Sequence, residues 1–244
     1  NAACIRKCGR SRLHLEELET RNVPSVAVFH SDNVPQFIPD LSSAASTLVV
    51  PDSVTIGEVS VSLNLAHPRS TDVDVFLVAP DGTRIELLTD VSFGPAGAVT
   101  PFRALTLEDR ADLPVRDVGL RAARSYSPEE PLGKLNTRNA QGAWALEIRD
   151  EAGGQTGTIV DWSLTITDRV AETEPNAAPA APQRIDTSGV VAGSIMSRTD
   201  TDEYQIRLNR DGVLTFRVDV SAGTGFDPRL VLLASNGEEI VRSE

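Results

Sequence analysis

Four aspartates are the residues of this chain with the clearest capacity for chemistry. Asp72 and Asp74 lie two positions apart in a Val-rich stretch, while Asp150 and Asp161 lie close to the tryptophans at positions 144 and 162. Carboxylate oxygens are the ligands that calcium prefers, so four aspartates gathered at one end of a domain could hold this hard cation. Structural ion pairs and turn capping explain the same residues, and we favour these roles over a metal site.

The sequence contains no recognisable set of catalytic residues. A serine protease needs a nucleophile, a base and an orienting acid in one place. The chain has no Gly-x-Ser-x-Gly, Gly-Thr-Ser or His-Gly-Thr motif. Among the three histidines, only His67 lies in a patterned segment, where we expect it to pack at a strand end. The motif Asp186-Thr-Ser-Gly189 occurs once, whereas aspartic protease chemistry needs two such loops. We therefore expect the chain as it stands not to be an enzyme.

Charge and hydropathy narrow the range of partners. The chain has 35 acidic and 23 basic residues, which gives a net charge of -12. This balance argues against nucleic acid and anionic membranes as partners and suits a protein that binds divalent cations. No apolar run of 18 residues exists, so we expect no membrane span. The two cysteines, Cys4 and Cys8, are predicted to be reduced thiols rather than zinc ligands.

Alternating apolar and polar residues predict the strands that must position these groups. The pattern is clearest in segments 59–65, 73–77, 85–88, 142–150 and 157–167. A period of two is typical of strands with one buried face. Pro and Gly residues mark turns between them, and no helix longer than two turns is predicted. We therefore expect an all-β fold, a jelly-roll β-sandwich followed by a second, incomplete β-sandwich.

The two tryptophans head the strongest pair of these strands. Trp144 begins the apolar face of segment 142–150, and Trp162 lies on the apolar face of segment 157–167. The connection Ala-Gly-Gly-Gln-Thr-Gly between the segments is short and rich in glycine. We expect the two strands to form a hairpin with both tryptophans in the core.

These strands and several turn motifs resemble the P domain (Homo B domain) that follows the catalytic domain in kexin- and furin-like subtilisin proteases. The resemblance covers residues 32–168. It depends on Leu65-Ala-His67-Pro, Asp72-Val-Asp74-Val-Phe-Leu77, Ala-Pro80-Asp-Gly82-Thr and the two tryptophan strands. It implies a jelly-roll module that packs on a serine-type endopeptidase domain and stabilises it. No catalytic domain is present in this chain.

Residues 1–31 differ in charge from the acidic remainder and are predicted to be a basic leader. The stretch Arg12-Leu-His-Leu15-Glu-Glu-Leu18-Glu-Thr-Arg21 resembles a leader found in many large exported proteins of planctomycete bacteria. This resemblance implies processing or export, and with it an extracellular or cell-surface location. Residues 169–184 contain a Pro- and Ala-rich run that predicts a stiff linker.

Residues 185–244 are predicted to be a second β module. We expect one hairpin over residues 204–220, around Asp211-Gly212, and another around Asn236-Gly237. With Glu174-Pro-Asn and Asp200-Thr-Asp-Glu-Tyr204, this part resembles a bacterial pre-peptidase C-terminal domain that lacks its closing strand.

The second resemblance implies a calcium site. Acidic and amide residues before and after the first strand occupy positions resembling the calcium ligands of collagenase-type members: Glu172, Glu174, Asn176, Asp200 and Asp202. Calcium accepts six to eight oxygen ligands, which such a cluster could supply. Ala177 stands where that family often has Asp.

Two functions are compatible with this organisation. The first is a non-catalytic accessory module of a secreted protein related to serine-type endopeptidases, which stabilises or targets a protease domain not present in this chain. The alternative is an independent extracellular adhesion or ligand-binding protein built from β-sandwich modules. The partner would be a protease domain in the first case and another extracellular protein in the second.

Overall fold

A computed structural model of the protein describes residues 26–91, 102–116, 124–172, 182–185, 189–195, 201–208, 213, 215–218 and 227–243. The chain divides into two compact units, residues 1–206 and 207–244, and each is described by itself. Of the predicted leader, residues 1–31, the first 25 residues lie outside the described residues. The predicted division into four segments stays a prediction.

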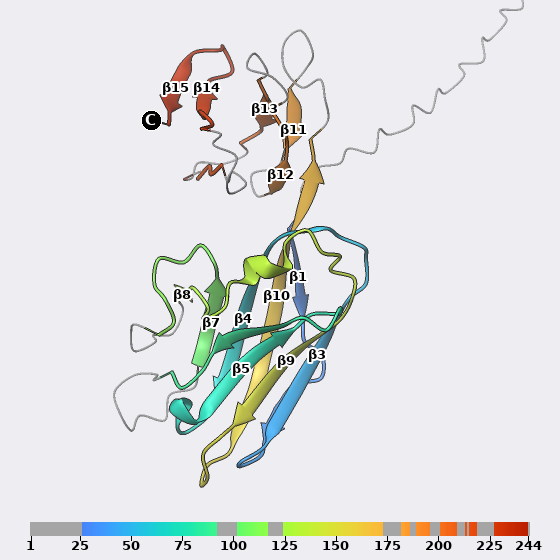
Figure 1. The fold of residues 1–244 in the computed structure, drawn as a ribbon, viewed down its shortest axis with the longest axis vertical. Helices are drawn as coiled ribbons and strands as arrows, with labels where there is room; N and C mark the ends of the chain where they lie inside the picture. The colour runs from blue at the N-terminus through green and yellow to red at the C-terminus, as the bar shows by residue number, and fades with distance from the viewer. Residues whose placement is uncertain are drawn as a thin grey trace, which may run out of the picture. The chain divides into compact units, whose positions relative to one another are not determined.

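The first unit contains a sandwich of two β-sheets (Figure 1). The larger sheet has the order β1 (Val26–His30), β10 (Gly157–Ala171), β4 (Ile56–Ala66), β7 (Phe102–Glu108) and β8 (Ser125–Tyr126), and β2 (Gln36–Ile38) and β12 (Val190–Ala192) also pair with β10. The smaller sheet has the order β3 (Ser43–Val50), β9 (Gly142–Asp150), β5 (Val73–Val78) and β6 (Arg84–Leu88). Two 3-10 helices, η1 (Ser70–Asp72) and η2 (Leu132–Leu135), lie in connections. The expected all-β sandwich is confirmed.

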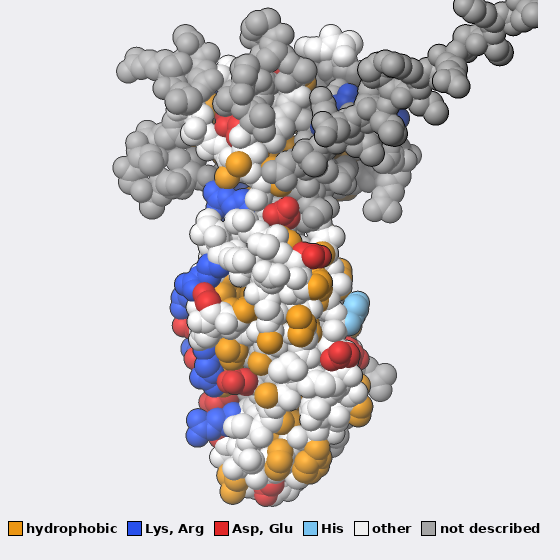
Figure 2. Space-filling view, turned by 90° about the vertical axis from the view of Figure 1, so that its right-hand side faces the viewer, with side chains coloured by type: hydrophobic (Ala, Val, Ile, Leu, Met, Phe, Trp, Pro, Cys, Tyr) orange, Lys and Arg blue, Asp and Glu red, His pale blue; other side chains and the backbone are white. Residues whose placement is uncertain are grey.

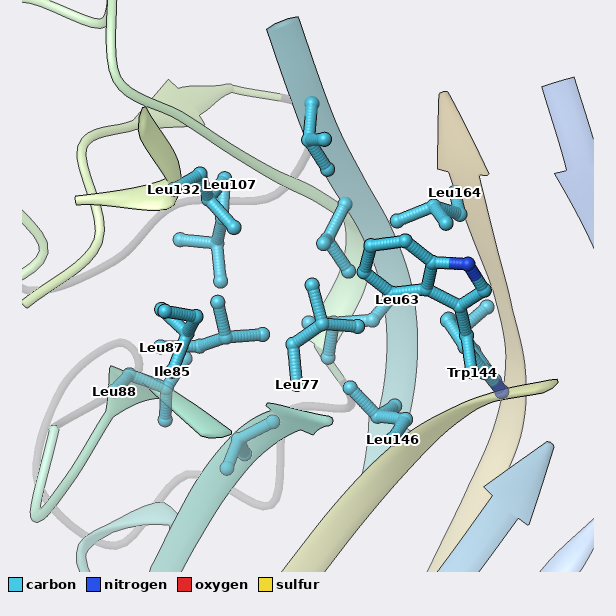
Figure 3. Packing of buried hydrophobic residues seen from close by; sticks show 14 of the residues in the cluster. Leu63, Leu77, Ile85, Leu87, Leu88, Leu107, Leu132, Trp144, Leu146 and Leu164 are labelled. Atoms are coloured by element: carbon cyan, nitrogen blue, oxygen red, sulfur yellow. The ribbon is translucent and has the colours of Figure 1, made fainter. Parts of the chain in front are cut away.

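Alternation in the sequence places one face of each central strand in the core. On β4, Val59, Val61, Leu63 and Leu65 are at most 2% exposed, while the residues between them are half-buried. Trp162 of β10 pairs with Leu63, and paired residues share a face of the sheet. Trp144 lies in the same core among leucines from both sheets (Figure 3). The predicted burial of both tryptophans is confirmed, since Trp144 is 0% exposed and Trp162 is 1% exposed.

The predicted hairpin between the two tryptophan strands is wrong. β9 pairs with β3 and β5, whereas β10 pairs with β1, β2, β4 and β12 in the opposite sheet. The Gly-rich connection therefore leads the chain from one sheet to the other, with Gly154 at a φ of 108°. The alternating pattern shows that a strand has a buried face, but it does not show which strand is its hydrogen-bonded neighbour.

Both indole N–H groups find acceptors inside the sandwich. Trp144 Nε1 donates to the Ala140 carbonyl at 2.8 Å, and Trp162 Nε1 donates to Ser46 Oγ, also at 2.8 Å. Ser46 Oγ donates in turn to Asn33 Oδ1 at 2.7 Å. Because a buried donor without an acceptor is costly, these contacts fix the orientation of each ring.

Beyond the sandwich core, β10 runs three residues into the segment predicted as a linker. Its last residues, Arg169–Ala171, pair in parallel with β12. The absence of a side chain at Gly57 makes room for this pairing, because a Cβ there would lie 2.8 Å from Val190 Cβ.

The described part of the second predicted module forms two small sheets. β11 (Gln183–Ile185) pairs in parallel with β13 (Tyr204–Ile206). The turn of the hairpin predicted over 204–220 lies outside the described residues, so this hairpin stays a prediction. In the second unit, β14 (Val231–Leu233) and β15 (Glu239–Arg242) pair antiparallel around Asn236-Gly237, so this predicted hairpin is confirmed.

Candidate functional site

His67 and Asp150 form a buried pair at one end of the sandwich. His67 follows directly after β4 and Asp150 ends β9, and both side chains are completely buried. His67 Nε2 lies 3.4 Å from Asp150 Oδ2, and His67 Nδ1 lies 2.6 Å from the Arg69 carbonyl oxygen. Gly157 packs against the ring, because a Cβ there would lie 2.6 Å from His67 Cδ2. Two strands and a glycine thus hold the imidazole in place.

This pair has a structural geometry rather than that of a catalytic base. The histidine base of a serine protease binds the orienting acid through one ring nitrogen and takes the proton of the nucleophile with the other. In His67 one nitrogen faces Asp150 and the other faces a backbone carbonyl. Neither nitrogen is available to a serine hydroxyl, which agrees with the predicted packing role.

The structure separates the four aspartates first considered for calcium. Val73 pairs with Asp150 across the sheet, so Asp72, Asp74 and Asp150 lie near the same end of β5 and β9. Asp161 is bound elsewhere, since the Asn64 amide donates to its two carboxylate oxygens at 2.8 and 2.9 Å. Arg69 Nη1 lies 3.4 Å from Asp72 Oδ2, which is the structural ion pair that we favoured.

Asp74 has the most strongly perturbed carboxyl at this end. Burial, together with the negative charges of Glu151 and Asp90, raises its pKa from 3.8 to about 6. Within the described ranges, no group of three or more His, Cys, Asp or Glu side chains is placed to hold a metal ion.

Two of the five predicted calcium ligands in the second module lie among the described residues. The Glu172 carboxylate accepts hydrogen bonds from the Ser194 N–H at 2.9 Å and from the Tyr204 hydroxyl. Asp202 precedes β13 and is half-buried. Glu174, Asn176 and Asp200 lie outside the described residues. The calcium site therefore stays a prediction.

An exposed apolar surface follows one edge of the sandwich. β1 and β3 are edge strands of the two sheets and lie next to each other. We define the apolar edge as five exposed side chains on β1, β2, β3 and the loop after β2: Val26 (41% exposed), Val28 (52%), Phe37 (62%), Leu41 (65%) and Val49 (65%). Figure 2 shows hydrophobic side chains spread along the face that includes this edge. Phe37 pairs with Thr158 near the start of β10, whereas Val26 and Val28 pair with Thr167 and Thr165 further along the strand, so the apolar edge is not one continuous patch.

The sequence of the sandwich matches a known family. Residues 56–101 and 123–166 match the family model of the proprotein convertase P-domain. Over these residues the sandwich is similar to a P domain. The matched residues include β4, β5, β6 and β9 and nearly all of the part of β10 that pairs with β4. They also include His67, Asp72, Asp74 and Asp150.

The chain is also similar to part of a protease. The chain is 30% identical over 151 residues to the Aeromonas extracellular serine protease of Aeromonas sobria. This match covers 51% of the chain but only 22% of that protein. The chain thus spans about a fifth of the length of this relative.

Two solved structures are also similar to this chain. The crystal structure of the Aeromonas sobria serine protease has a TM-score of 0.38 and 21% identity, over 60% of this chain and 28% of that chain. The complex of the same protease with the chaperone ORF2 gives a TM-score of 0.39 and 22% identity, over 60% and 27%.

The apolar edge was not predicted from the sequence. A signal for part of it exists in Leu48-Val49-Val50, because three successive apolar residues of a strand cannot all face one side. Leu48 and Val50 are buried, which leaves Val49 outside. Phe37 precedes the buried Ile38 on β2 and therefore lies on the outer face, whereas Leu41 carries no such signal, since its exposure depends on how the loop between β2 and β3 folds.

Proposed function

We propose that the sandwich is a P domain, a non-catalytic module that docks on a serine protease domain and stabilises it. The observation that carries the proposal is the match of residues 56–101 and 123–166 to the proprotein convertase P-domain. The similarity to an extracellular serine protease supports the same partner class. The packing of His67 against Asp150 and a backbone carbonyl fits a module without a catalytic base of its own.

The apolar edge is the surface that we assign to this docking. Phe37 and Leu41, which lie near the connection between β9 and β10, are each more than 60% exposed, so their burial by a partner would remove apolar area from water. In contrast, the outer face of the small sheet carries ion pairs such as Arg84 with Glu147 and Arg149 with Glu151. An apolar partner surface therefore fits the edge better than it fits that face.

A chimera tests the proposal. The part of the Aeromonas protease that aligns with this chain is replaced by this chain, and the melting temperature and peptidase activity of the chimera are measured. We expect Phe37→Asp with Leu41→Asp to lower the melting temperature of the protease part, because two charges would then face an apolar surface. The control is Ile240→Asp, an equally exposed apolar residue (62%) of β15 in the second unit.

The same variants in the isolated chain separate docking from folding. Because both side chains are exposed, the double substitution should leave the melting curve of the isolated chain unchanged. If the chimeras with the edge substitutions and with Ile240→Asp behave alike, the apolar edge is not the docking surface.

We also propose that the chain functions outside the cell. The relative in Aeromonas sobria is named as an extracellular protease, and an accessory module would share the location of its protease. In the described residues no helix is long and apolar enough to cross a membrane. Detection of the protein in the cell's cytoplasmic fraction alone would contradict this location.

A further inference from the structure

Two consecutive glutamates take the place of a neighbouring strand at the edge of the small sheet. β6 pairs with β5 on one side only. On its other side, the Glu129 N–H donates to the Leu87 carbonyl at 3.1 Å, and the Glu130 N–H donates to the Glu86 carbonyl at 2.9 Å. These contacts satisfy outward carbonyl groups that an open edge would leave exposed.

The carboxylates of the same two residues satisfy the N–H groups of this edge. Glu130 Oε2 accepts from the Glu86 N–H at 3.0 Å. Glu129 Oε1 accepts from the Thr89 N–H at 3.0 Å, and Glu129 Oε2 accepts from the Thr89 hydroxyl at 3.0 Å. An ionised carboxylate binds an N–H about twice as strongly as a neutral acceptor does. The closure of this edge therefore depends on charge.

Charged groups from two further segments keep these carboxylates ionised. Burial disfavours the charge of Glu129, whose side chain is 2% exposed, but its contact with Arg116 and its bonds from Thr89 outweigh this and lower its pKa. Lys134 Nζ of η2 lies 2.7 Å from Glu130 Oε1 and, together with the Glu86 N–H, lowers the pKa of Glu130.

Two other acidic groups face this cluster from β6 and β5. A hydrogen bond with the Glu129 carboxylate, together with burial, raises the pKa of Glu86. Arg116 Nη2 also lies 3.8 Å from a Glu86 oxygen. The charge of Glu86 also contributes to the raised pKa of Asp74 on β5. On acidification Glu86 takes up a proton first, and this leaves Glu129 charged.

We propose that Glu129 and Glu130, named here the glutamate latch, are an acid-releasable cover of the β6 edge. In neutral solution the ionised latch holds the backbone groups of β6. Protonation of the latch weakens its bonds to the Glu86 and Thr89 N–H groups and exposes the edge to solvent. A group whose pKa is lowered in the folded state stabilises that state above its unfolded pKa, and this contribution is lost as pH falls through the folded value. Release therefore occurs below the usual pKa of glutamate.

Amide hydrogen exchange of the full chain, followed by NMR between pH 7 and pH 3.5, tests the latch. Each rate is divided by the intrinsic rate at the same pH. We expect protection of the Glu86 and Thr89 amides to fall roughly tenfold on acidification, while amides between β9 and β5 keep theirs. Glu129→Gln should give the low protection of Thr89 already at pH 7. The control is Glu147→Gln, whose carboxylate on the same sheet pairs with Arg84 and contacts no β6 amide.

Arg116→Ala provides a second test that does not depend on the folding of the Glu129 variant, because the Arg116 side chain is 64% exposed. Without this cation the pKa of Glu129 is raised, so release should move to a higher pH. The proposal is overturned if protection at Glu86 and Thr89 does not change with pH, or if Arg116→Ala leaves the release midpoint where it was.

Discussion

The bond between Trp162 and Ser46 predicts a measurable coupling between the two sheets. Trp162 lies on β10 of the large sheet and Ser46 on β3 of the small sheet, and both are buried. Ser46→Ala leaves the indole N–H without an acceptor in the core. We expect this to lower the free energy of unfolding by about 1–3 kcal/mol, the cost of a buried unsatisfied donor.

Trp162→Phe removes the donor instead. Ser46 Oγ then still donates to Asn33 Oδ1, so no polar group is left without a partner. The loss comes from the smaller ring and the missing bond, about 1–2 kcal/mol. Once the donor is gone, Ser46→Ala costs less. The double variant should therefore be more stable than the sum of the single effects predicts, by about 1 kcal/mol.

Urea denaturation followed by far-ultraviolet circular dichroism measures the four unfolding free energies of this cycle. A parallel cycle with Trp144→Phe and Ser46→Ala is the control, because Trp144 donates to the Ala140 carbonyl and not to Ser46. Additivity within about 0.3 kcal/mol in the Trp162 cycle would refute the idea that this bond joins the two sheets.

Three further predictions concern charge, calcium and catalysis. Since the pKa of Asp74 is raised to about 6, its contribution to stability is present below the unfolded value of 3.8 and is lost as pH rises through 6. Asp74→Asn removes the buried charge, so in denaturation curves at pH 8 the variant should be more stable than the wild type by about 1–2 kcal/mol, a gain that is absent at pH 4. Calcium should raise the melting temperature of the full chain in calorimetry, and Glu174→Ala with Asp202→Ala should remove this shift. Equal melting curves with calcium and with a chelator would contradict the site. The purified chain should not cleave casein, and turnover that copurifies with it and is stopped by a serine-protease inhibitor would show otherwise.

The sequence was sufficient to predict the strands whose two faces differ. Val59, Val61, Leu63 and Leu65 alternate with polar residues, and this pattern survives because one side of β4 is core and the other is not. Strand pairing was not predictable in the same way. The alternation in β9 is equally satisfied by a hairpin with β10 and by packing across the core from it, and only the distant strands β3 and β5 decide between the two.

The candidate surfaces were less accessible to sequence reasoning than the core. Glu129 and Glu130 lie in a Pro-rich stretch without periodicity, and their role becomes visible only when β6 lies beside them. His67 was correctly expected to pack at a strand end, but its partner Asp150 is 83 positions away and was first considered for calcium. A local pattern contains no information about contacts of this range.

The exchange of sheets between β9 and β10 has a consequence for how the protein is made. β10 lies between β1 and β4 in the large sheet, and β9 lies between β3 and β5 in the small one. Pairs such as Val26 with Thr167 and Ser43 with Arg149 join residues more than 100 positions apart. During synthesis from the N-terminus, neither sheet can close until residues 142–171 have left the ribosome. Until then β1 and β3 lack the strands that they pair with, so folding is slow and late. A chain with this order of assembly stays incompletely folded until its synthesis is well advanced.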